Sequence, residues 1–401
     1  MNILQIANKA IYPPDGGSIA ILSIAKAYVN NGHKVHLLNM ITHKHHNNTK
    51  IIEPEFRDNL TISGIKINTK ISFIKLIANF LFSSKPFISE RFLSKKFENS
   101  LINLFENNLF DFVQIEGLYS LQYIKCIKQN YKGKVLYRPH NVEYLIWERN
   151  AFEAKSILKK IYFKSLSKRI KKLEEKYLNS YDYLIPISNA DAEIFNKLGN
   201  QKPFKVSPFG IDFNIIINQS GADKPDSEQS INYIGALDWI PNQKGLKWFI
   251  DYCFPIVLES FPEIKLNIAG RNAPDWFIKK LNQNNNIRYV GEVNNAYEYL
   301  HTPGPVIVPL FSGSGMRVKI IESMAIKKAI VSTSIAAEGI NCMHNENILI
   351  ADNPEYFANS VISLLKNPDL QKEIGENASK FVKDNFDFNI IANNILNFIK
   401  D

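Results

Sequence analysis

The chain has 401 residues, 45% of them hydrophobic and 22% charged, which is the composition of a globular protein with enough apolar material for more than one domain. Its most apolar window, residues 73–82, is about half as long as a membrane span and contains Lys75, which excludes an integral membrane protein. The net charge of +9 leaves nucleic acid, an anionic membrane surface and phosphate-bearing substrates as candidate partners.

The cysteines and the start of the chain bear on location and on metal binding. Cys126, Cys253 and Cys342 lie far apart, and the sequence has no CxxC pair or other metal-ligand spacing. The chain enters a predicted strand directly, without the basic and apolar segments of a signal peptide. We therefore expect a cytoplasmic protein with free thiols and no bound metal.

Strands and helices alternate along the first half of the chain. Short apolar runs predict strands, and Ile21, Leu22, Ala25 and Tyr28 recur at the spacing of a helix that ends at Gly32. Such alternation is typical of a doubly wound parallel sheet. The predicted strands are residues 2–7, 34–38, 112–116, 134–138 and 183–188.

A polar stretch with Gly, Pro and Ser, residues 218–230, is predicted to be a linker. The alternation restarts after it, and the pattern from residue 353 onward is helical. The sequence therefore predicts an α/β protein with two Rossmann-like domains facing a central cleft, where ligands bind at the carboxyl ends of strands. The predicted strands here are 231–235, 264–270, 287–290, 305–309, 329–333 and 348–351, and the last helices are 354–366, 368–384 and 387–400.

The loop after the first strand, residues 8–17, contains two prolines and ends in Gly16 and Gly17 at a predicted helix start. Glycines let backbone approach a ligand, and a helix start favours an anion. The loop lacks the GxGxxG pattern, so a nicotinamide cofactor is not indicated. From these residues alone, an anion site and a plain strand-to-helix turn remain equally good interpretations.

A second candidate site follows the predicted strand 305–309. A loop of small residues, 313–315, leads into a helix predicted over 316–325. A phosphate at the helix start would meet free N–H groups and two cations, and an acid further along could accept hydrogen bonds from ribose hydroxyls. The alternative is an ordinary solvated helix face. The candidate residues are Ser314, Gly315, Arg317, Lys319 and Glu322.

Two further segments leave two interpretations open. His140, in RPHNVE directly after a predicted strand, lies where polar recognition is expected, although a lone histidine is more often structural. The basic helix predicted over 155–176 either lies on an anionic membrane surface or packs in the core with a solvated basic face. Its irregular apolar stripe consists of Ile157, Ile161, Leu166, Ile170 and Leu173.

Seven segments in this order resemble the retaining GT-B glycosyltransferases of family four, which build bacterial surface polysaccharides. In the first half they are PPDGGSIAILSIAKAYVNNGHKVHLL, RPHNVEYLIWERNA, and YLIPISNADAEIFNKLG with PFGIDF. In the second half they are YIGALDWIPNQKGLKWF, LNIAGRNAP, GSGMRVKIIESMA and IVSTSIAAEGI, and the DWxPN form resembles one subgroup. The resemblance spans nearly the whole chain and implies transfer of a sugar from a nucleoside-diphosphate sugar to a glycan or lipid-linked glycan, as in lipopolysaccharide assembly.

The resemblance also implies roles for single residues. His140 would contact the donor sugar near the reacting carbon, and Glu322 would bind the ribose. No cofactor is implied, because the nucleotide sugar is a co-substrate. The residues implied to bind the diphosphate or the base are Gly16, Gly17, Arg271, Arg317 and Lys319.

The chain departs from the family pattern at two positions. Ser314 stands where the family commonly has the first of two glutamates, a residue that would touch the donor sugar. Ala236 stands where the family has an arginine, and the DWIPN insertion displaces Lys244. The first departure leaves the identity of the donor sugar undetermined. Because of the second departure, Arg317 and Lys319 would have to supply the positive charge that the family's arginine and lysine provide.

Glycosyl transfer requires stabilisation of the negative charge that develops on the leaving diphosphate. A helix start with two cations supplies this electrostatically, so we expect metal-independent transfer, with retention. A sugar-nucleotide 2-epimerase on the same fold would instead need acid and base groups facing the sugar. A non-catalytic nucleotide-sugar-binding protein is the alternative of another class, and nucleic-acid binding is not expected.

The resemblance implies an acceptor-side domain over 1–207, a donor-side domain over 208–384 and a last helix, 385–401, that crosses back to the first domain. An apolar face at helical spacing in that helix must be buried somewhere. Its residues are Phe388, Ile391, Ile395 and Phe398.

Overall fold

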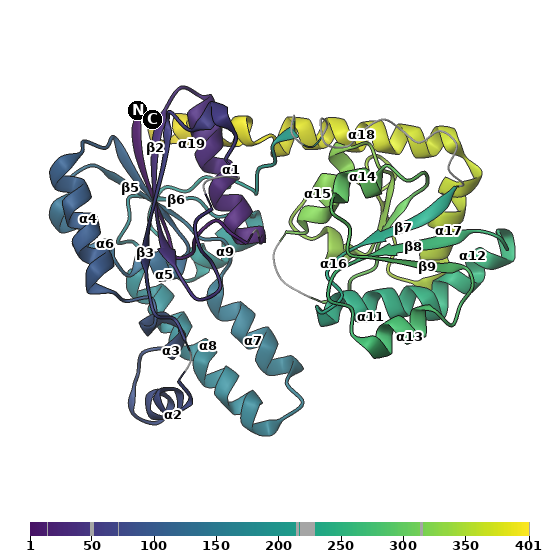
Figure 1. Cartoon of the computed structure of the whole chain (residues 1–401), viewed down its shortest axis with the longest axis horizontal. Helices are drawn as coiled ribbons and strands as arrows, with labels where there is room; N and C mark the ends of the chain where they lie inside the picture. Colours follow the sequence, from purple (N-terminus) through teal and green to yellow (C-terminus); the bar gives the residue numbers. More distant parts are fainter. Residues whose placement is uncertain are drawn as a thin grey trace. The chain divides into compact units, whose positions relative to one another are not determined.

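The structure is a computed structural model, and it describes residues 1–13, 15–48, 52–70, 72–213, 216, 229–312 and 316–400. The chain divides into two compact units (Figure 1), which are Met1–Gly210 with Phe388–Asp401, and Ile211–Asp387. Each unit is built on a six-stranded parallel sheet. The predicted α/β architecture of two Rossmann-like units is therefore confirmed.

The first sheet has the strand order β3-β2-β1-β4-β5-β6. Along β1, Ile3 belongs to one apolar cluster and Leu4 to another, because successive side chains of a strand point to opposite faces. The cluster on one face includes α1 and α19, and the cluster on the other includes α4 and α6. The strands are β1 (Asn2–Ala7), β2 (Lys34–Ile41), β3 (Leu60–Lys66), β4 (Phe112–Glu116), β5 (Lys134–Arg138) and β6 (Tyr183–Leu184).

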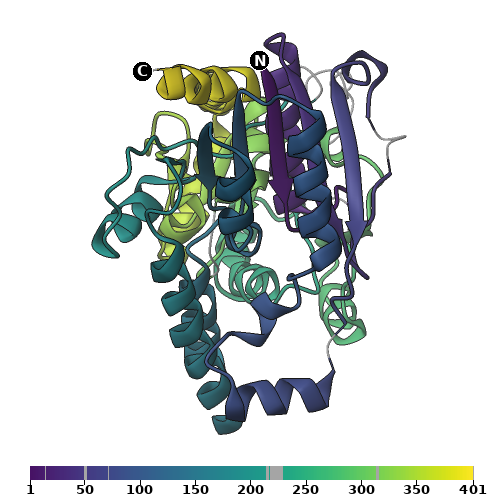
Figure 2. The same ribbon diagram turned by 90° about the vertical axis from the view of Figure 1, so that its left-hand side faces the viewer.

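The helices of the first unit connect its parallel strands and extend beyond the sheet at one end, where α7 and α8 form a hairpin (Figures 1 and 2). They are α1 (Gly16–Asn30), α2 (Phe73–Phe82), α3 (Phe87–Glu90), α4 (Lys95–Asn107), α5 (Leu118–Leu121), α6 (Ile124–Asn130), α7 (Glu143–Glu153), α8 (Ile157–Tyr177), α9 (Asn189–Lys197) and α19 (Phe388–Lys400), with a 3-10 turn at Pro54–Phe56.

The last helix, α19, packs against α1 in the first unit. Phe388, Ile391 and Ile395 are buried there, and Phe398 is partly buried. Gly210 lies close to the start of this helix, since a Cβ at residue 210 would be 2.9 Å from the Cα of Phe388. The apolar face of α19 is thus covered by the same core that lies beneath β1 and β2.

The second sheet has the order β12-β11-β10-β7-β8-β9. Its strands are β7 (Ser230–Ile234), β8 (Lys265–Ala269), β9 (Ile287–Gly291), β10 (Val306–Val308), β11 (Ile330–Ser332) and β12 (Leu349–Ile350). Its helices are α11 (Ile240–Trp248), continued by a π-helical turn (Phe249–Cys253) into α12 (Phe254–Ser260), then α13 (Asp275–Leu281), α14 (Ala296–Leu300), α15 (Val318–Ala325), α16 (Ser334–Ala337), α17 (Pro354–Lys366) and α18 (Pro368–Phe386).

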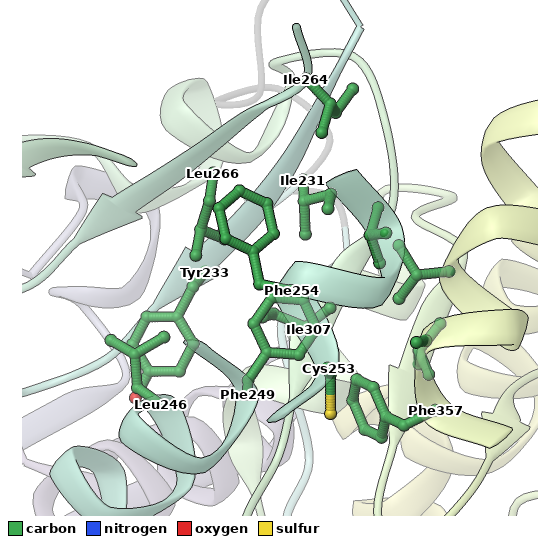
Figure 3. Packing of buried hydrophobic residues seen from close by; sticks show 14 of the residues in the cluster. Ile231, Tyr233, Leu246, Phe249, Cys253, Phe254, Ile264, Leu266, Ile307 and Phe357 are labelled. Atoms are coloured by element: carbon green, nitrogen blue, oxygen red, sulfur yellow. The ribbon is translucent and has the colours of Figure 1, made fainter. Parts of the chain in front are cut away.

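The core of the second unit joins strand and helix side chains in one apolar cluster (Figure 3). Gly245 lets α11 pack directly on the end of β10, because a Cβ at that residue would be 1.7 Å from the carbonyl oxygen of Pro309. The contact sets the position of the loop that precedes α11. The residues at the centre of the cluster are Ile231, Tyr233, Leu246, Phe249, Phe254, Leu266, Ile307 and Phe357.

Three details differ from the sequence analysis or lie beyond what the structure describes. Strand β3 was not predicted; it pairs with β2 alone at the sheet edge, and its side chains are mostly half-buried, which weakens the apolar signal. Helix α15 begins at Val318, and not at Met316 as predicted. Most of the predicted linker, 218–230, lies outside the described residues.

Candidate functional site

A buried carboxylate lies at the carboxyl ends of the central strands of the first unit. Glu116 ends β4 and is fully buried. Its Oε2 is 2.5 Å from Nε2 of His140 and 3.3 Å from Nη1 of Arg138, which ends β5. The turn after β4 is held beside β5, because Gly117 donates its N–H to the carbonyl of Arg138 at 3.0 Å. The predicted site residue His140 therefore has a charged partner that the sequence analysis did not identify.

The other oxygen of Glu116 is held by two side-chain amides, one from the neighbouring strand β1 and one from β4 itself. The side chains of Gln5 and Gln114 donate to Oε1 at 2.9 and 2.5 Å, and the hydroxyl of Tyr28 donates to Oε1 of Gln114 at 2.6 Å. Burial alone would raise the pKa of Glu116, but the charge of Arg138 and the hydrogen bond from His140 lower that pKa to about 2. Glu116 is therefore ionised at neutral pH.

This arrangement orients the imidazole of His140. Because the carboxylate of Glu116 faces Nε2, it favours the form in which Nε2 carries a proton and donates it. The His140 side chain is 17% exposed, whereas that of Glu116 is 0% exposed. One side of the ring is thus fixed by a buried anion while the residue keeps access to solvent.

The start of α1, which contains Gly16 and Gly17, is occupied by the side-chain carboxylate of the preceding residue. Asp15 caps the helix by accepting the N–H of Ser18 at 2.8 Å, and it pairs with Lys9 at 2.9 Å. Burial acts to raise the pKa of Asp15, but the charge of Lys9 and the hydrogen bond from Ser18 lower it to about 2. At Gly17 a Cβ would be 2.6 Å from Nζ of Lys9, so a side chain there would displace the lysine.

The segment that follows His140 is fixed by a second buried acid. Glu174, on α8, accepts the N–H groups of Glu143 and Tyr144 at 2.8 and 3.2 Å, which satisfies two free donors at the start of α7. Burial, and after it the charge of Glu143, raises the pKa of Glu174 to about 8. The α7–α8 hairpin thereby positions the RPHNVE segment.

In the second unit, Lys319 points from α15 toward the end of β7. Its Nζ donates to the carbonyl of Ile234 at 3.4 Å and to Oδ1 of Asn242 at 3.2 Å, and it lies 4.8 Å from the centre of the Tyr233 ring. Burial, and after it the charge of Arg317, lowers the pKa of Lys319 to about 7. Both acceptors of Lys319, a backbone carbonyl and a side-chain amide oxygen, are neutral.

The DWIPN segment, residues 238–242, contacts both predicted cations. Arg317 lies over the Trp239 ring at 5.8 Å from its centre, and Asn242 accepts from Lys319 while donating to the carbonyl of Ala236 at 2.8 Å. From the sequence alone, this motif was only a point of resemblance to one subgroup. The structure shows that it holds Lys319 and Arg317 beside the loop that contains Ala236.

Glu322 lies one helical turn after Lys319 on α15, so the two side chains share a face. Its Oε1 accepts the hydroxyl hydrogen of Tyr297, from α14, at 2.9 Å. Burial raises the pKa of Glu322 to about 7, although the hydrogen bond from Tyr297 acts in the opposite direction. Near neutral pH this carboxyl group is therefore close to its titration midpoint.

The other predicted donor-site residues differ in where the structure places them. Arg317 is the residue before α15 and not a residue within it, and its side chain is buried. Arg271 is exposed in the loop after β8, where its carbonyl accepts the N–H of Leu237 at 2.9 Å. Ser314 and Gly315 lie outside the described residues. The structure thus brings Arg317, Lys319 and the DWIPN segment together and leaves the small-residue loop undescribed.

The DWIPN segment, Arg317, Lys319 and Glu322 all lie within a part of the chain that matches a known protein family. Residues 228–367 match the family described as Glycosyl transferases group 1, a segment that includes β7, the DWIPN motif and α15. The protein is a glycosyltransferase. The glycosyltransferase is also 26% identical to an uncharacterised 44.6 kDa protein in the cps region of Klebsiella pneumoniae, over 96% of each chain.

Solved structures share the complete fold of the glycosyltransferase. Sucrose-phosphate synthase of Thermosynechococcus elongatus superposes with a TM-score of 0.68 at 14% identity, over 100% of this chain and 98% of the other. Anabaena HepE, solved in complex with UDP, gives a TM-score of 0.67 at 14% identity over 100% of both chains, and it has also been solved with UDP-glucose. At these identities the likeness shows a common fold, which is GT-B.

Proposed function

We propose that this glycosyltransferase moves a sugar from a nucleoside-diphosphate sugar to a glycan or lipid-linked glycan during assembly of a cell-surface polysaccharide, with retention at the anomeric carbon. The observation that carries the proposal is the environment of Lys319, a partly buried cation whose hydrogen bonds go to neutral oxygens and whose charged neighbour is another cation, Arg317. Such a site stabilises a bound anion. A donor diphosphate is the anion that the activity requires.

Two comparisons support the choice of donor and pathway. The Anabaena protein with the same fold binds UDP and UDP-glucose, which favours a uridine nucleotide as the first donor to test. The Klebsiella relative belongs to a cps region, which favours polysaccharide assembly. We also propose a cytoplasmic location, which is supported by the three free cysteines.

In this proposal the two clusters have different chemical tasks. Arg317 and Lys319 stabilise the negative charge that grows on the diphosphate as the glycosidic bond breaks, and Glu322 accepts hydrogen bonds from the ribose. His140 contacts the donor sugar near the reacting carbon, where positive charge develops, while Glu116 acts as a positioning residue that fixes the imidazole. Arg271 contacts the base or a phosphate, and Gly16 and Gly17 lie near the diphosphate.

A thermal-shift screen of nucleoside diphosphates and their sugars tests the donor class. A ligand that binds only the folded protein raises its unfolding temperature, and we expect uridine nucleotides to give the largest rise. Absence of a shift with every nucleoside diphosphate at millimolar concentration would rule out the proposed site. Donor turnover without epimerisation, followed by NMR with a glycan acceptor, separates transfer from 2-epimerase activity.

The affinity for UDP is expected to fall as pH rises above 7. Lys319 must carry a proton to pair with the diphosphate, and its pKa of about 7 in the free protein means that binding above that pH requires proton uptake. The affinity should decrease by up to about tenfold per pH unit between pH 7 and 9. Calorimetry on Lys319→Met should show weaker binding without this slope, and a slope that persists in the variant would assign it to another group.

Transfer is expected to continue in the presence of a chelator. Among the described residues, no group of three His, Cys, Asp or Glu side chains is arranged to hold a metal ion. In this proposal Arg317 and Lys319 neutralise the leaving diphosphate instead. Initial rates measured with EDTA should match those without it, and loss of activity that magnesium or manganese restores would contradict the proposal.

A further inference from the structure

Helix α2 exposes apolar side chains along one face. Ile74, Ile77 and Leu81 are exposed and follow the i, i+3, i+7 spacing of a single helix face, and Phe82 is exposed beside them. In a helix of a globular domain such a face normally packs on the core. Here the residues turned toward the protein are others, including Phe80, whose ring lies 5.7 Å from that of Tyr162.

The free end of the α7–α8 hairpin repeats this pattern. Phe152 at the end of α7 is exposed, as are Ile157, Leu158 and Ile161 in the first turns of α8. Further along α8, Leu166, Ile170 and Leu173 are buried. The basic helix therefore divides into a core-packed part and an end whose apolar side chains are exposed.

The two exposed segments lie at the same end of the first unit, as both views show (Figures 1 and 2). Helices α2 and α8 are also joined by direct contacts. Arg169 of α8 donates to the carbonyl of Asn79 at 3.1 Å and to the carbonyl of Phe80 at 2.7 Å, and its guanidinium lies over the Phe80 ring. The end of α2 is thus fixed to α8, with its apolar face left uncovered.

We call these eight exposed side chains the apolar end of the first unit. Each is between 45% and 88% exposed. Exposed apolar side chains gathered at one end of a domain mark an interaction site, whereas single exposed apolar residues are normal. Its members are Ile74, Ile77, Leu81, Phe82, Phe152, Ile157, Leu158 and Ile161.

The charges around the apolar end are mostly positive. Four lysines lie among or beside the exposed residues of α8, and Glu153 is the one acid between residues 150 and 164. All four lysines are exposed, so their amines are available to an anionic surface. They are Lys155, Lys159, Lys160 and Lys164.

We propose that the apolar end of the first unit inserts into the surface of a membrane that contains anionic lipid. Exposed Ile, Leu and Phe side chains enter the boundary between headgroups and acyl chains, and the neighbouring lysines pair with lipid phosphates. Among the described residues, no helix is long and apolar enough to cross a bilayer, so the contact is peripheral. Membrane contact bears on the proposed function in one respect, because a lipid-linked acceptor would lie in the same membrane. Binding of the protein to the membrane requires no donor.

Sedimentation with lipid vesicles tests this surface on the whole chain. Vesicles of phosphatidylcholine alone are compared with vesicles that also contain phosphatidylglycerol. We expect the wild-type protein to bind the anionic vesicles, and the double variants Ile157→Glu/Leu158→Glu and Ile77→Glu/Leu81→Glu to bind them roughly tenfold or more weakly. Lys159→Glu/Lys160→Glu should weaken binding to a similar degree, because each lysine near an anionic surface contributes about fivefold.

The matched control is Leu109→Glu, an equally exposed leucine in the same unit. Its carbonyl accepts a hydrogen bond from the side chain of Asn2 at the start of β1, far along the sheet from the apolar end. This variant should bind vesicles as the wild type does. Equal binding of all variants, or no binding of the wild type to either vesicle, would overturn the proposal. So would a dimer of the wild type that dissociates in Ile157→Glu/Leu158→Glu without vesicle binding.

The same variants separate this inference from the proposed function. Calorimetry with UDP should give the wild-type affinity for Ile157→Glu/Leu158→Glu, because the substituted residues are not among those proposed to bind the donor, and Arg317 and Lys319 lie in the second unit. Loss of vesicle binding with intact UDP binding supports membrane contact independently of the donor. Intact vesicle binding with no UDP binding would leave the membrane surface standing and remove the donor assignment.

Discussion

Replacing His140 with alanine is expected to lower kcat by about 10²- to 10⁴-fold, with a much smaller change in donor affinity. His140 lies at the carboxyl end of β5, held by the buried carboxylate of Glu116 at 2.5 Å. A group that contacts the sugar near the breaking bond acts most strongly as charge develops there, so its loss should affect turnover more than binding. Steady-state kinetics together with calorimetry of the binding of the intact nucleoside-diphosphate sugar measure the two effects separately.

The matched variant for this prediction is Glu116→Gln, which keeps the size of the side chain and removes its charge. If Glu116 acts by positioning the imidazole, kcat should fall by about 10- to 100-fold, less than in His140→Ala, while donor affinity stays near the wild-type value. The change also leaves Arg138 buried without its anion, so thermal unfolding must show that the variant is folded. Poor donor binding with normal turnover at saturation would show that the role assigned to His140 is wrong.

Arg317→Ala is expected to weaken UDP binding by about 1.5–3 kcal/mol, which is roughly 10- to 150-fold in Kd. The residue precedes α15, and its guanidinium lies over Trp239 beside Lys319, so the substitution removes a cation from the proposed diphosphate site. Arg288→Ala is the control, because Arg288 is an exposed arginine on β9 of the same unit. An unchanged Kd in a folded Arg317→Ala protein would remove Arg317 from the site.

Much of the fold follows from short apolar runs, because parallel strands covered by helices on both faces are apolar along their whole length. Strands β1, β4 and β8 are almost fully buried, and their sequences predict them directly. Strand β3 has a Leu-Thr-Ile-Ser-Gly pattern with half-buried side chains, so its signal is indistinguishable from a loop. Its place in the sheet depends on pairing with β2, which is a tertiary contact.

The candidate sites were predictable to a different degree. Arg317, Lys319 and Glu322 follow a strand and a small-residue loop, so local sequence was enough to select them. Glu116 was missed because it reads as the last residue of a buried strand, and its partner His140 is 24 residues away in the sequence. A charged residue at the end of a buried run, directly before a glycine, is the signal that would have found it.

The DWIPN segment shows why motif resemblance alone did not assign roles. Its contacts with Lys319 and Arg317 bridge 77 and 78 residues of sequence and arise only when α11 and α15 pack on the same sheet. Sequence spacing carries no information about such a contact. The same limit applies to the apolar end of the first unit, where 155–176 contains both buried and exposed apolar residues at similar spacing.

A crystal structure of the glycosyltransferase with bound UDP tests the central claim most directly. We expect the diphosphate within hydrogen-bond distance of the side chains of Arg317 and Lys319 in the second unit, with a ribose hydroxyl hydrogen-bonded to the carboxyl group of Glu322. UDP bound in the second unit away from α15, or in the first unit alone, would contradict the assignment of the donor site.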